Sequence, residues 1–189
     1  MSNIFQRGLQ EHLGLFQGLS GLSAEIERAA ALIAGALRTG RKLMLCGNGG
    51  SAADSQHIAA EMTGRFVKDR RPLAAIALST DTSALTSIAN DYTFDEVFAR
   101  QVSGLGAEGD CLIAISTSGN SRNVMRAADA ARAAGMHVIG LLGRDGGALK
   151  ELCDVAIVVS SHTTARIQEA HIFIGHTLCA LVEEALGFG

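Results

Sequence analysis

The sequence predicts an α/β fold in which a five-stranded parallel sheet is flanked by helices. Five short, nearly continuous apolar runs recur along the chain, and each is followed by a segment with helical spacing. Such runs are typical of strands that are buried on both faces of a parallel sheet. Glycine, serine, threonine and asparagine gather where the runs end, which is where open parallel sheets bind ligands.

Two helices are predicted ahead of the first apolar run. Residues 2–17 and 22–39 carry apolar side chains at helical spacing, and Gly40 ends the second segment. The strands are predicted at 42–46, 73–78, 111–115, 138–142 and 155–159. The other helices are predicted over 51–64, after Asp81, over 92–102, from Ser121 to about Ala134, briefly after Gly147, and after Thr164.

Length and composition fit a single domain of 189 residues with a well-formed core, since 48% of the residues are hydrophobic. The formal net charge of −3 argues against a binder of nucleic acids or anionic membranes. No apolar run is long enough to cross a bilayer, and residues 1–11 lack a signal pattern, so a cytoplasmic protein is expected. The four cysteines are scattered without a CxxC pair, and therefore indicate neither a zinc motif nor a disulfide framework.

The segment from Ile115 to Ser121 is the sharpest local feature. Ser116, Thr117, Ser118 and Ser121 place four hydroxyls where a predicted strand meets a predicted helix. These hydroxyls can donate hydrogen bonds, and the first amides of the helix are unpaired and lie at the positive end of its dipole. The segment therefore predicts a site for a phosphate monoester. A serine-rich helix cap is the simpler alternative, although one hydroxyl would suffice for a cap.

A glycine-rich turn follows the first predicted strand, with the sequence Gly47-Asn48-Gly49-Gly50-Ser51. It matches neither GxGxxG nor GxxxxGK[ST], which excludes a dinucleotide fingerprint and a P-loop. The turn could bind an anion or a hydroxyl group. Alternatively, it is a tight turn in which Ser51 caps the next helix.

His57 and Glu61 stand four residues apart in the helix that follows this turn. They share one face of the helix and lie about one turn apart. This face could serve acid–base catalysis or metal ligation. A solvated surface pair is the common alternative at this spacing.

Polar residues elsewhere carry weaker signals. Gln168 and His176 are eight residues apart, which is about 12 Å along a helix, so they reach one metal only by leaning together or from different subunits. Spacing alone assigns His171 and His176 to a helix face rather than to a ligand set. Asn90-Asp91 could bind a polyol hydroxyl or form a turn.

Taken in order, these motifs resemble the phosphoheptose isomerases, which are sedoheptulose-7-phosphate isomerases with the sugar-isomerase (SIS) fold. The resemblance covers the chain from about residue 40 to its end. The matching segments are Cys46–Asp54, His57 with Glu61, Asn90-Asp91, Ile115–Ser121, Arg166–Glu169 and His176.

The resemblance implies a flavodoxin-like SIS domain over residues 1–189 and a homotetramer in which residues 1–40 pack as a helical extension. Active sites would lie at subunit interfaces. The implied reaction converts sedoheptulose 7-phosphate to D-glycero-D-manno-heptose 7-phosphate, the first step toward ADP-heptose and the lipopolysaccharide core.

The same resemblance implies roles for individual residues. Glu61 would be the catalytic base and His176 the acid. The phosphate would be held by Ser116, Thr117, Ser118 and Ser121. The sugar would be lined by Asn48, Gly49, Gly50, Ser51, Asn90, Asp91 and Gln168. One Zn²⁺ per subunit would be bound by His57, Glu61, Gln168 and His176.

These residue types suit the implied chemistry. Aldose–ketose isomerisation moves a proton between carbons 1 and 2 through an enediol, which a carboxylate base can start. An imidazole or a metal can polarise the carbonyl and stabilise the enediolate oxygen. A metal bound tightly to Glu61 would compete with its basicity, so the sequence leaves open whether the metal is catalytic or structural.

A second hypothesis comes from a paralogue of this family, a tetrameric adaptor that binds the replication initiator DnaA. The chain resembles it in Asn90-Asp91 and in the stretch from Ala165 to Glu169. The family pattern implies that the adaptor has lost the catalytic carboxylate and the final histidine. Because this chain keeps Glu61 and His176, the isomerase is favoured.

Overall fold

The computed structural model of the chain describes residues 3–188. Within that range, five strands form one parallel sheet in the order β2-β1-β3-β4-β5, so the predicted fold class is confirmed. The strands are β1 (Leu43–Cys46), β2 (Ala75–Ala77), β3 (Cys111–Ser116), β4 (His137–Gly143) and β5 (Val155–Val159).

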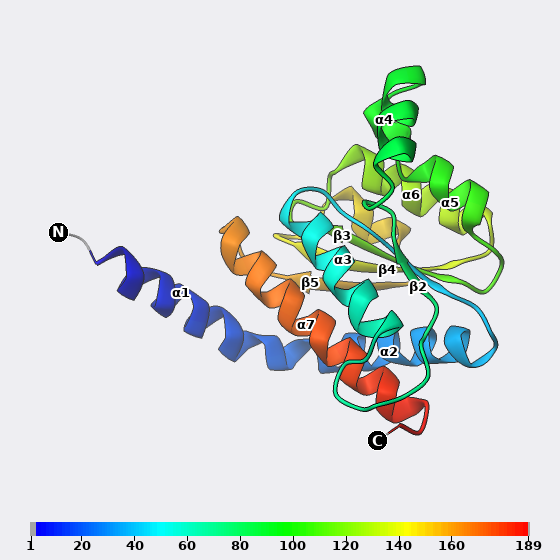
Figure 1. Cartoon of the computed structure of the whole chain (residues 1–189). Coiled ribbons are helices and arrows are strands. Elements are labelled where there is room, and N and C mark those ends of the chain that lie inside the picture. Colours follow the sequence, from blue (N-terminus) through cyan, green and yellow to red (C-terminus); the bar gives the residue numbers. More distant parts are fainter. Residues whose placement is uncertain (1–2, 189) are drawn as a thin grey trace.

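Helices cover both faces of the sheet (Figure 1). The α-helices are α1 (Ile4–Gly18), α2 (Ser23–Arg38), α3 (Gly50–Thr63), α4 (Thr82–Asp91), α5 (Ala99–Leu105), α6 (Arg122–Ala133) and α7 (Thr164–Ala185). Short 3₁₀ segments are η1 (Leu19–Leu22), η2 (Phe94–Glu96) and η3 (Ala148–Leu152). Residues from α2, α3 and α7 share one apolar core with one face of the sheet, and α5 and α6 share the other.

The strand order places a topological switch point between β1 and β3. The chain leaves β1 through α3 to reach β2 on one side, and β3 then adds on the other side. Because α3 and α6 lie on opposite faces, the carboxyl ends of β1 and β3 open into the crevice where such sheets bind ligands.

Burial follows position in the sheet. Every residue of β1 and β3 is buried, as expected for strands covered on both faces. The two edge strands differ from that expectation, because Ile76 in β2 is 39% exposed and alternate residues of β5 are only half-buried. An edge strand has a neighbour on one side only, and the helices here cover it incompletely.

The helix predicted over residues 92–102 was wrong in its extent. The backbone of Thr93 is extended ahead of η2, and Val97 and Phe98 separate η2 from a later helix, α5. Ion pairs from Asp95 to Arg122 and from Glu96 to Arg126 hold η2 against α6. The arginine side chains of both pairs are largely exposed, so each pair contributes at most about 1 kcal/mol to this packing.

The two N-terminal helices behave differently. α2 packs against α7 and the sheet, with Ile33 fully buried, whereas α1 projects from the body of the molecule (Figure 1). Ile4 and Phe5 on α1 are 74% and 72% exposed. No helix among residues 3–188 is both long and apolar enough to cross a bilayer.

Candidate active site

Three side chains from two helices converge at the centre of the candidate site. His57 and Glu61 lie on α3, and His176 lies on α7. The Nε2 atom of His57 is 3.2 Å from Oε1 of Glu61 and 3.1 Å from Nε2 of His176. One ligand atom from each of the three residues lies within 4.8 Å of the others.

Close packing of α3 on α7 makes this convergence possible. A Cβ atom at Gly175 would lie 2.6 Å from Cδ1 of Ile58, so only glycine allows the two helices to approach this closely. Ile58 follows His57 and Gly175 precedes His176. The contact of Gly175 with Ile58 therefore brings the imidazoles of His57 and His176 to the same height along the two helices.

The three side chains fit a divalent metal. Two imidazole nitrogens and one carboxylate oxygen form a donor set that zinc sites commonly use, and three protein ligands leave a position for substrate. The His57 side chain is 48% exposed and the Glu61 side chain 26%, so the cluster opens toward solvent. Spacing within α7 alone could not indicate this arrangement of His176, because the other two side chains lie on α3.

Gln168 lies on α7 about two turns before His176, near the start of the helix. A Cβ atom at Gly50 would lie 2.4 Å from its Nε2 atom, so the amide rests on the first residue of α3. This places Gln168 beside the glycine-rich turn that was predicted to line the sugar. Its predicted role as a metal ligand stays a prediction.

The glycine-rich turn is tied to the opposite face of the sheet. Asn48 and Asn123 exchange two hydrogen bonds between their side-chain amides, at 2.9 and 2.8 Å. Asn123 lies in the first turn of α6, so the pair spans the crevice between β1 and β3. Sequence reasoning missed Asn123, because nothing local marks it as the partner of a residue 75 positions away.

The hydroxyls of the 116–121 segment gather as predicted. Oγ of Ser116 is 3.0 Å from Oγ of Ser121 and 3.5 Å from Oγ of Ser118. Ser121 occupies the N-cap position of α6, yet its side chain makes no capping hydrogen bond. The Ser121 hydroxyl therefore does not cap α6, whereas those of Ser116 and Ser118 accept hydrogen bonds from the amides of Gly119 and Asn120, both at 3.1 Å. The hydroxyl protons and the first α6 amides can still donate to an anion.

A neighbouring loop fixes the backbone of this segment. Gly119 has φ +65°, and a Cβ atom there would overlap the carbonyl group of Gly146. The side chain of Asn120 accepts a hydrogen bond from the amide of Ala148 at 3.1 Å. The segment is thus preorganised before any ligand arrives.

Asp54 is a further polar residue whose role the sequence did not indicate. It lies one turn before His57 on α3, and one of its carboxylate oxygens is buried without a hydrogen-bond partner among residues 3–188. Burial raises the pKa of this carboxyl group, and the nearby His57 opposes the rise. The only indication in the sequence is that Asp54 lies three residues before His57, which places both side chains on the same face of the helix.

Asn90 and Asp91 end α4, and within this chain they are not brought to the His57 cluster. Both are exposed, and the Asn90 amide donates to the Asp91 carboxylate at 2.8 Å. α4 stands away from α3 and packs on η2 (Figure 1). Their predicted contact with the sugar stays a prediction.

Comparison with known proteins agrees with this geometry. A family model described as "SIS domain" matches residues 15–143. A phosphoheptose isomerase from Nitratiruptor sp. is 58% identical over 181 residues, which cover 95% of this chain and 97% of that protein. One from Campylobacter concisus is 51% identical over 185 residues, or 98% of each chain. The solved structure of the phosphoheptose isomerase from Neisseria gonorrhoeae superimposes with a TM-score of 0.91 at 47% identity, covering 95% of this chain and 97% of that one.

Proposed function

The chain belongs to the phosphoheptose isomerases of the SIS-domain family, and from this premise we propose that it interconverts sedoheptulose 7-phosphate and D-glycero-D-manno-heptose 7-phosphate. The observation that carries the proposal is the meeting of Glu61 and His176 from separate helices in one cluster. In a Gram-negative cell this reaction begins the supply of heptose for lipopolysaccharide.

The cluster provides the two proton carriers that the reaction needs. The Glu61 carboxylate takes a proton from carbon 1 of the open-chain ketose, while a ring N–H of His176 donates one to the carbonyl oxygen on carbon 2. An enediol results. Glu61 then returns its proton to carbon 2, and His176 takes the proton of the carbon 1 hydroxyl, which yields the aldose.

The far end of the substrate is held at the carboxyl ends of the strands. Ser116, Thr117, Ser118 and Ser121 bind the phosphate together with the first amides of α6. The sugar hydroxyls contact the turn formed by Asn48, Gly49, Gly50 and Ser51, together with Gln168 and the Asn90-Asp91 pair. Anchoring the phosphate fixes the reacting carbons against Glu61 and His176.

We assign a Zn²⁺ ion to His57, Glu61 and His176, with Gln168 as the fourth ligand implied by the family. When bound, the metal would polarise the carbonyl group and stabilise the enediolate oxygen. The donor set supports this assignment because imidazole and carboxylate are common zinc ligands.

The proposal includes a homotetramer with active sites at subunit interfaces. Two observations support it: the exposed apolar residues Ile4 and Phe5 on the projecting α1, and the exposure of Asn90 and Asp91 at the end of α4, which packs on η2. The proposed location is the cytoplasm, which suits the free thiols of Cys46, Cys111, Cys153 and Cys179. Light scattering should give four times the chain mass.

The DnaA adaptor hypothesis gains no support from the fold or from the relatives described above. The two hypotheses differ in one measurement. Purified protein is incubated with sedoheptulose 7-phosphate, and aldose formation is followed for wild type, Glu61→Gln and His176→Gln, with the exposed His162→Gln as control. We expect turnover in wild type and the control and loss of most activity in the other two. An inert wild type that captures DnaA would replace the isomerase with the adaptor.

A further inference from the structure

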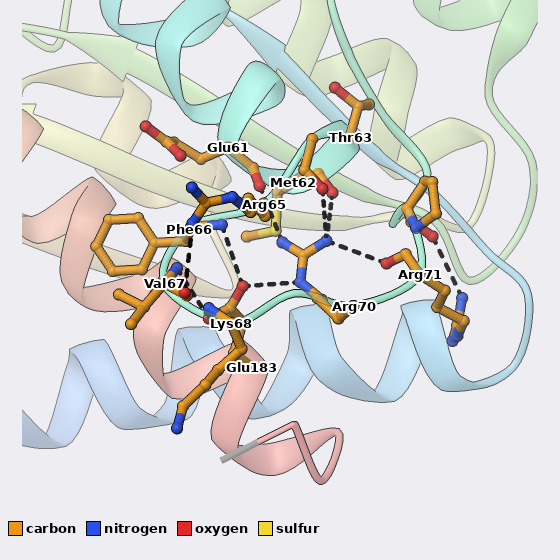
Figure 2. Close-up of polar contacts among 12 residues, drawn as sticks. Glu61, Met62, Thr63, Arg65, Phe66, Val67, Lys68, Arg70, Arg71 and Glu183 are labelled. Carbon is orange, nitrogen blue, oxygen red and sulfur yellow. Dashed lines mark hydrogen bonds and ion pairs between the residues drawn. The ribbon is translucent and has the colours of Figure 1, made fainter.

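A buried ion pair joins the end of α7 to the loop that follows α3. The Arg70 side chain is fully buried and that of Glu183 is 4% exposed, with Nε of Arg70 2.8 Å from Oε1 of Glu183 (Figure 2). The two residues are 113 positions apart. Removing both charges from water costs free energy that can exceed their mutual attraction. A gain in stability is therefore not a sufficient reason for a buried ion pair at this place.

Glu183 closes the loop by accepting hydrogen bonds from its backbone. The amides of Phe66, Val67 and Lys68 donate to the two carboxylate oxygens at 3.2, 3.3 and 3.3 Å. These amides and the Arg70 side chain hold the pKa of Glu183 below its usual value despite burial. The loop is thus wrapped around a charged carboxylate.

Arg70 uses its remaining N–H groups on the C-terminus of α3. It donates to the backbone carbonyls of Glu61 and Met62, both at 2.9 Å, and of Gly64 and Arg71 at 3.4 and 3.1 Å. Carbonyls in the last turn of a helix lack intrahelical partners, so the guanidinium acts as a cap. Figure 2 shows the Glu61 carbonyl facing Arg70 while its carboxylate points away.

The same loop also reaches His176. The ring of Phe66 stacks on the His176 imidazole with 5.5 Å between centroids and 23° between planes. The Phe66 amide is one of the three that Glu183 holds. One ion pair therefore contacts the backbone of the proposed base and fixes the ring that packs on the proposed acid.

We propose that Arg70 and Glu183 are positioning residues for the isomerisation, which set the Glu61 carboxylate and the His176 imidazole at their working separation. This inference rests on the proposed function. The pair touches neither substrate nor reacting atoms, and acts through the Glu61 backbone and the Phe66 ring. A displacement of about 1 Å at a reacting group can lower a rate roughly 100-fold.

The test compares two isosteric substitutions of buried carboxylates. Glu183→Gln removes the charge of this pair. Asp110→Asn is the matched control, because Asp110 is also buried, accepts hydrogen bonds from the amides of Lys42 and Ala107, and pairs with the Lys42 ammonium. Asp110 directly precedes β3, the central strand, and its carboxylate binds Lys42 and Ala107 rather than α3, α7 or the loop that Glu183 holds, so it affects stability without touching the site.

We expect Glu183→Gln to lower kcat roughly 10- to 100-fold while KM for sedoheptulose 7-phosphate changes less than about threefold. Asp110→Asn should keep both constants near wild type. Proton NMR supplies a readout independent of turnover. The His176 ring resonance, assigned with His176→Gln, should shift in Glu183→Gln when the Phe66 ring current is altered, and should not move in Asp110→Asn.

If the Glu183→Gln protein fails to fold, two other substitutions test the same inference. Arg70→Lys keeps the charge but loses the planar fork, and Phe66→Leu removes only the stacked ring; each should reproduce the loss of kcat. An active wild type whose Glu183→Gln, or in its place Arg70→Lys, keeps normal kcat overturns the inference. If wild type lacks isomerase activity, the proposed function fails, and the His176 resonance then decides whether the pair positions that ring.

Discussion

The Nε2 atoms of His57 and His176 lie 3.1 Å apart, although 119 residues separate them along the chain. Two neutral imidazoles at this distance share one proton, or both direct lone pairs at a cation. The relationship depends on α3 and α7 packing closely, which Gly175 permits. Two helix faces that each resemble an ordinary surface thereby form the candidate site.

Zinc binding tests the donor role of these imidazoles. We expect metal-depleted protein to take up one Zn²⁺ per chain, because two imidazoles and a carboxylate already converge. His57→Ala should weaken zinc affinity by at least about tenfold, as measured by competition with a chromophoric chelator. His162→Ala, at an exposed position, is the control. Equal affinity in all three proteins would contradict the assignment.

The phosphate site is tested by removing its hydroxyls. Ser116, Ser118 and Ser121 together replaced by alanine should raise KM for sedoheptulose 7-phosphate by at least about tenfold, since each hydrogen bond to a charged group contributes roughly 1.5–3 kcal/mol. Ser103→Ala, on α5, is the control, because its hydroxyl bonds only to the Ala99 carbonyl.

The single substitution Ser121→Ala tests whether the Ser121 hydroxyl caps α6 or is free to bind phosphate. Because the Ser121 side chain makes no capping hydrogen bond, the free energy of unfolding should change by less than about 0.5 kcal/mol, compared with about 1 kcal/mol for a working cap. Chemical denaturation measures it. A loss near the larger figure would restore the cap interpretation.

Gly50→Ala tests the place of Gln168. The new Cβ would displace the Gln168 amide, which is the flexible end of a side chain, so stability should change by less than about 1 kcal/mol. We expect kcat/KM to fall roughly tenfold because the amide leaves the sugar-binding turn. Gly35→Ala is the control, since a Cβ there meets nothing within 4 Å. Normal kcat/KM in Gly50→Ala would remove Gln168 from the site.

His171 gives stability a dependence on pH. Burial lowers the pKa of His171 from its usual value of 6.5 to about 4. The unfolded chain therefore binds the His171 proton more tightly than the folded chain does. The contribution of neutral His171 to the free energy of unfolding is complete above pH 6.5 and declines as pH falls toward 4. Between pH 7 and pH 5 the loss should be about 2 kcal/mol.

His171→Leu should flatten this dependence, as shown by urea denaturation at the two pH values. His162→Leu, at an exposed position, should keep the wild-type dependence. A His171→Leu protein with the same slope as wild type would show that another group controls acid stability.

Local patterns predicted much of the architecture. Apolar runs followed by helical spacing gave the strand and helix order, because both periodicities are properties of short segments. The hydroxyls of Ser116, Ser118 and Ser121 could be placed at a strand end for the same reason. The helix predicted over 92–102 was wrong in its extent, since local periodicity carries no information on contacts such as those between η2 and α6, whose paired residues lie 27 and 30 positions apart.

The sequence by itself determined the fold class, the two loops at strand ends and the i,i+4 pair of His57 and Glu61. Residue spacing did not show that His176 completes their cluster, which only the family resemblance implied. Tertiary structure alone decided that Asn123 holds Asn48, and that Arg70 with Glu183 supports the loop behind Glu61. The physical reason is that helix–helix contacts between distant segments depend on side-chain packing and on the filling of space. Neither is encoded in the spacing of residues within one helix.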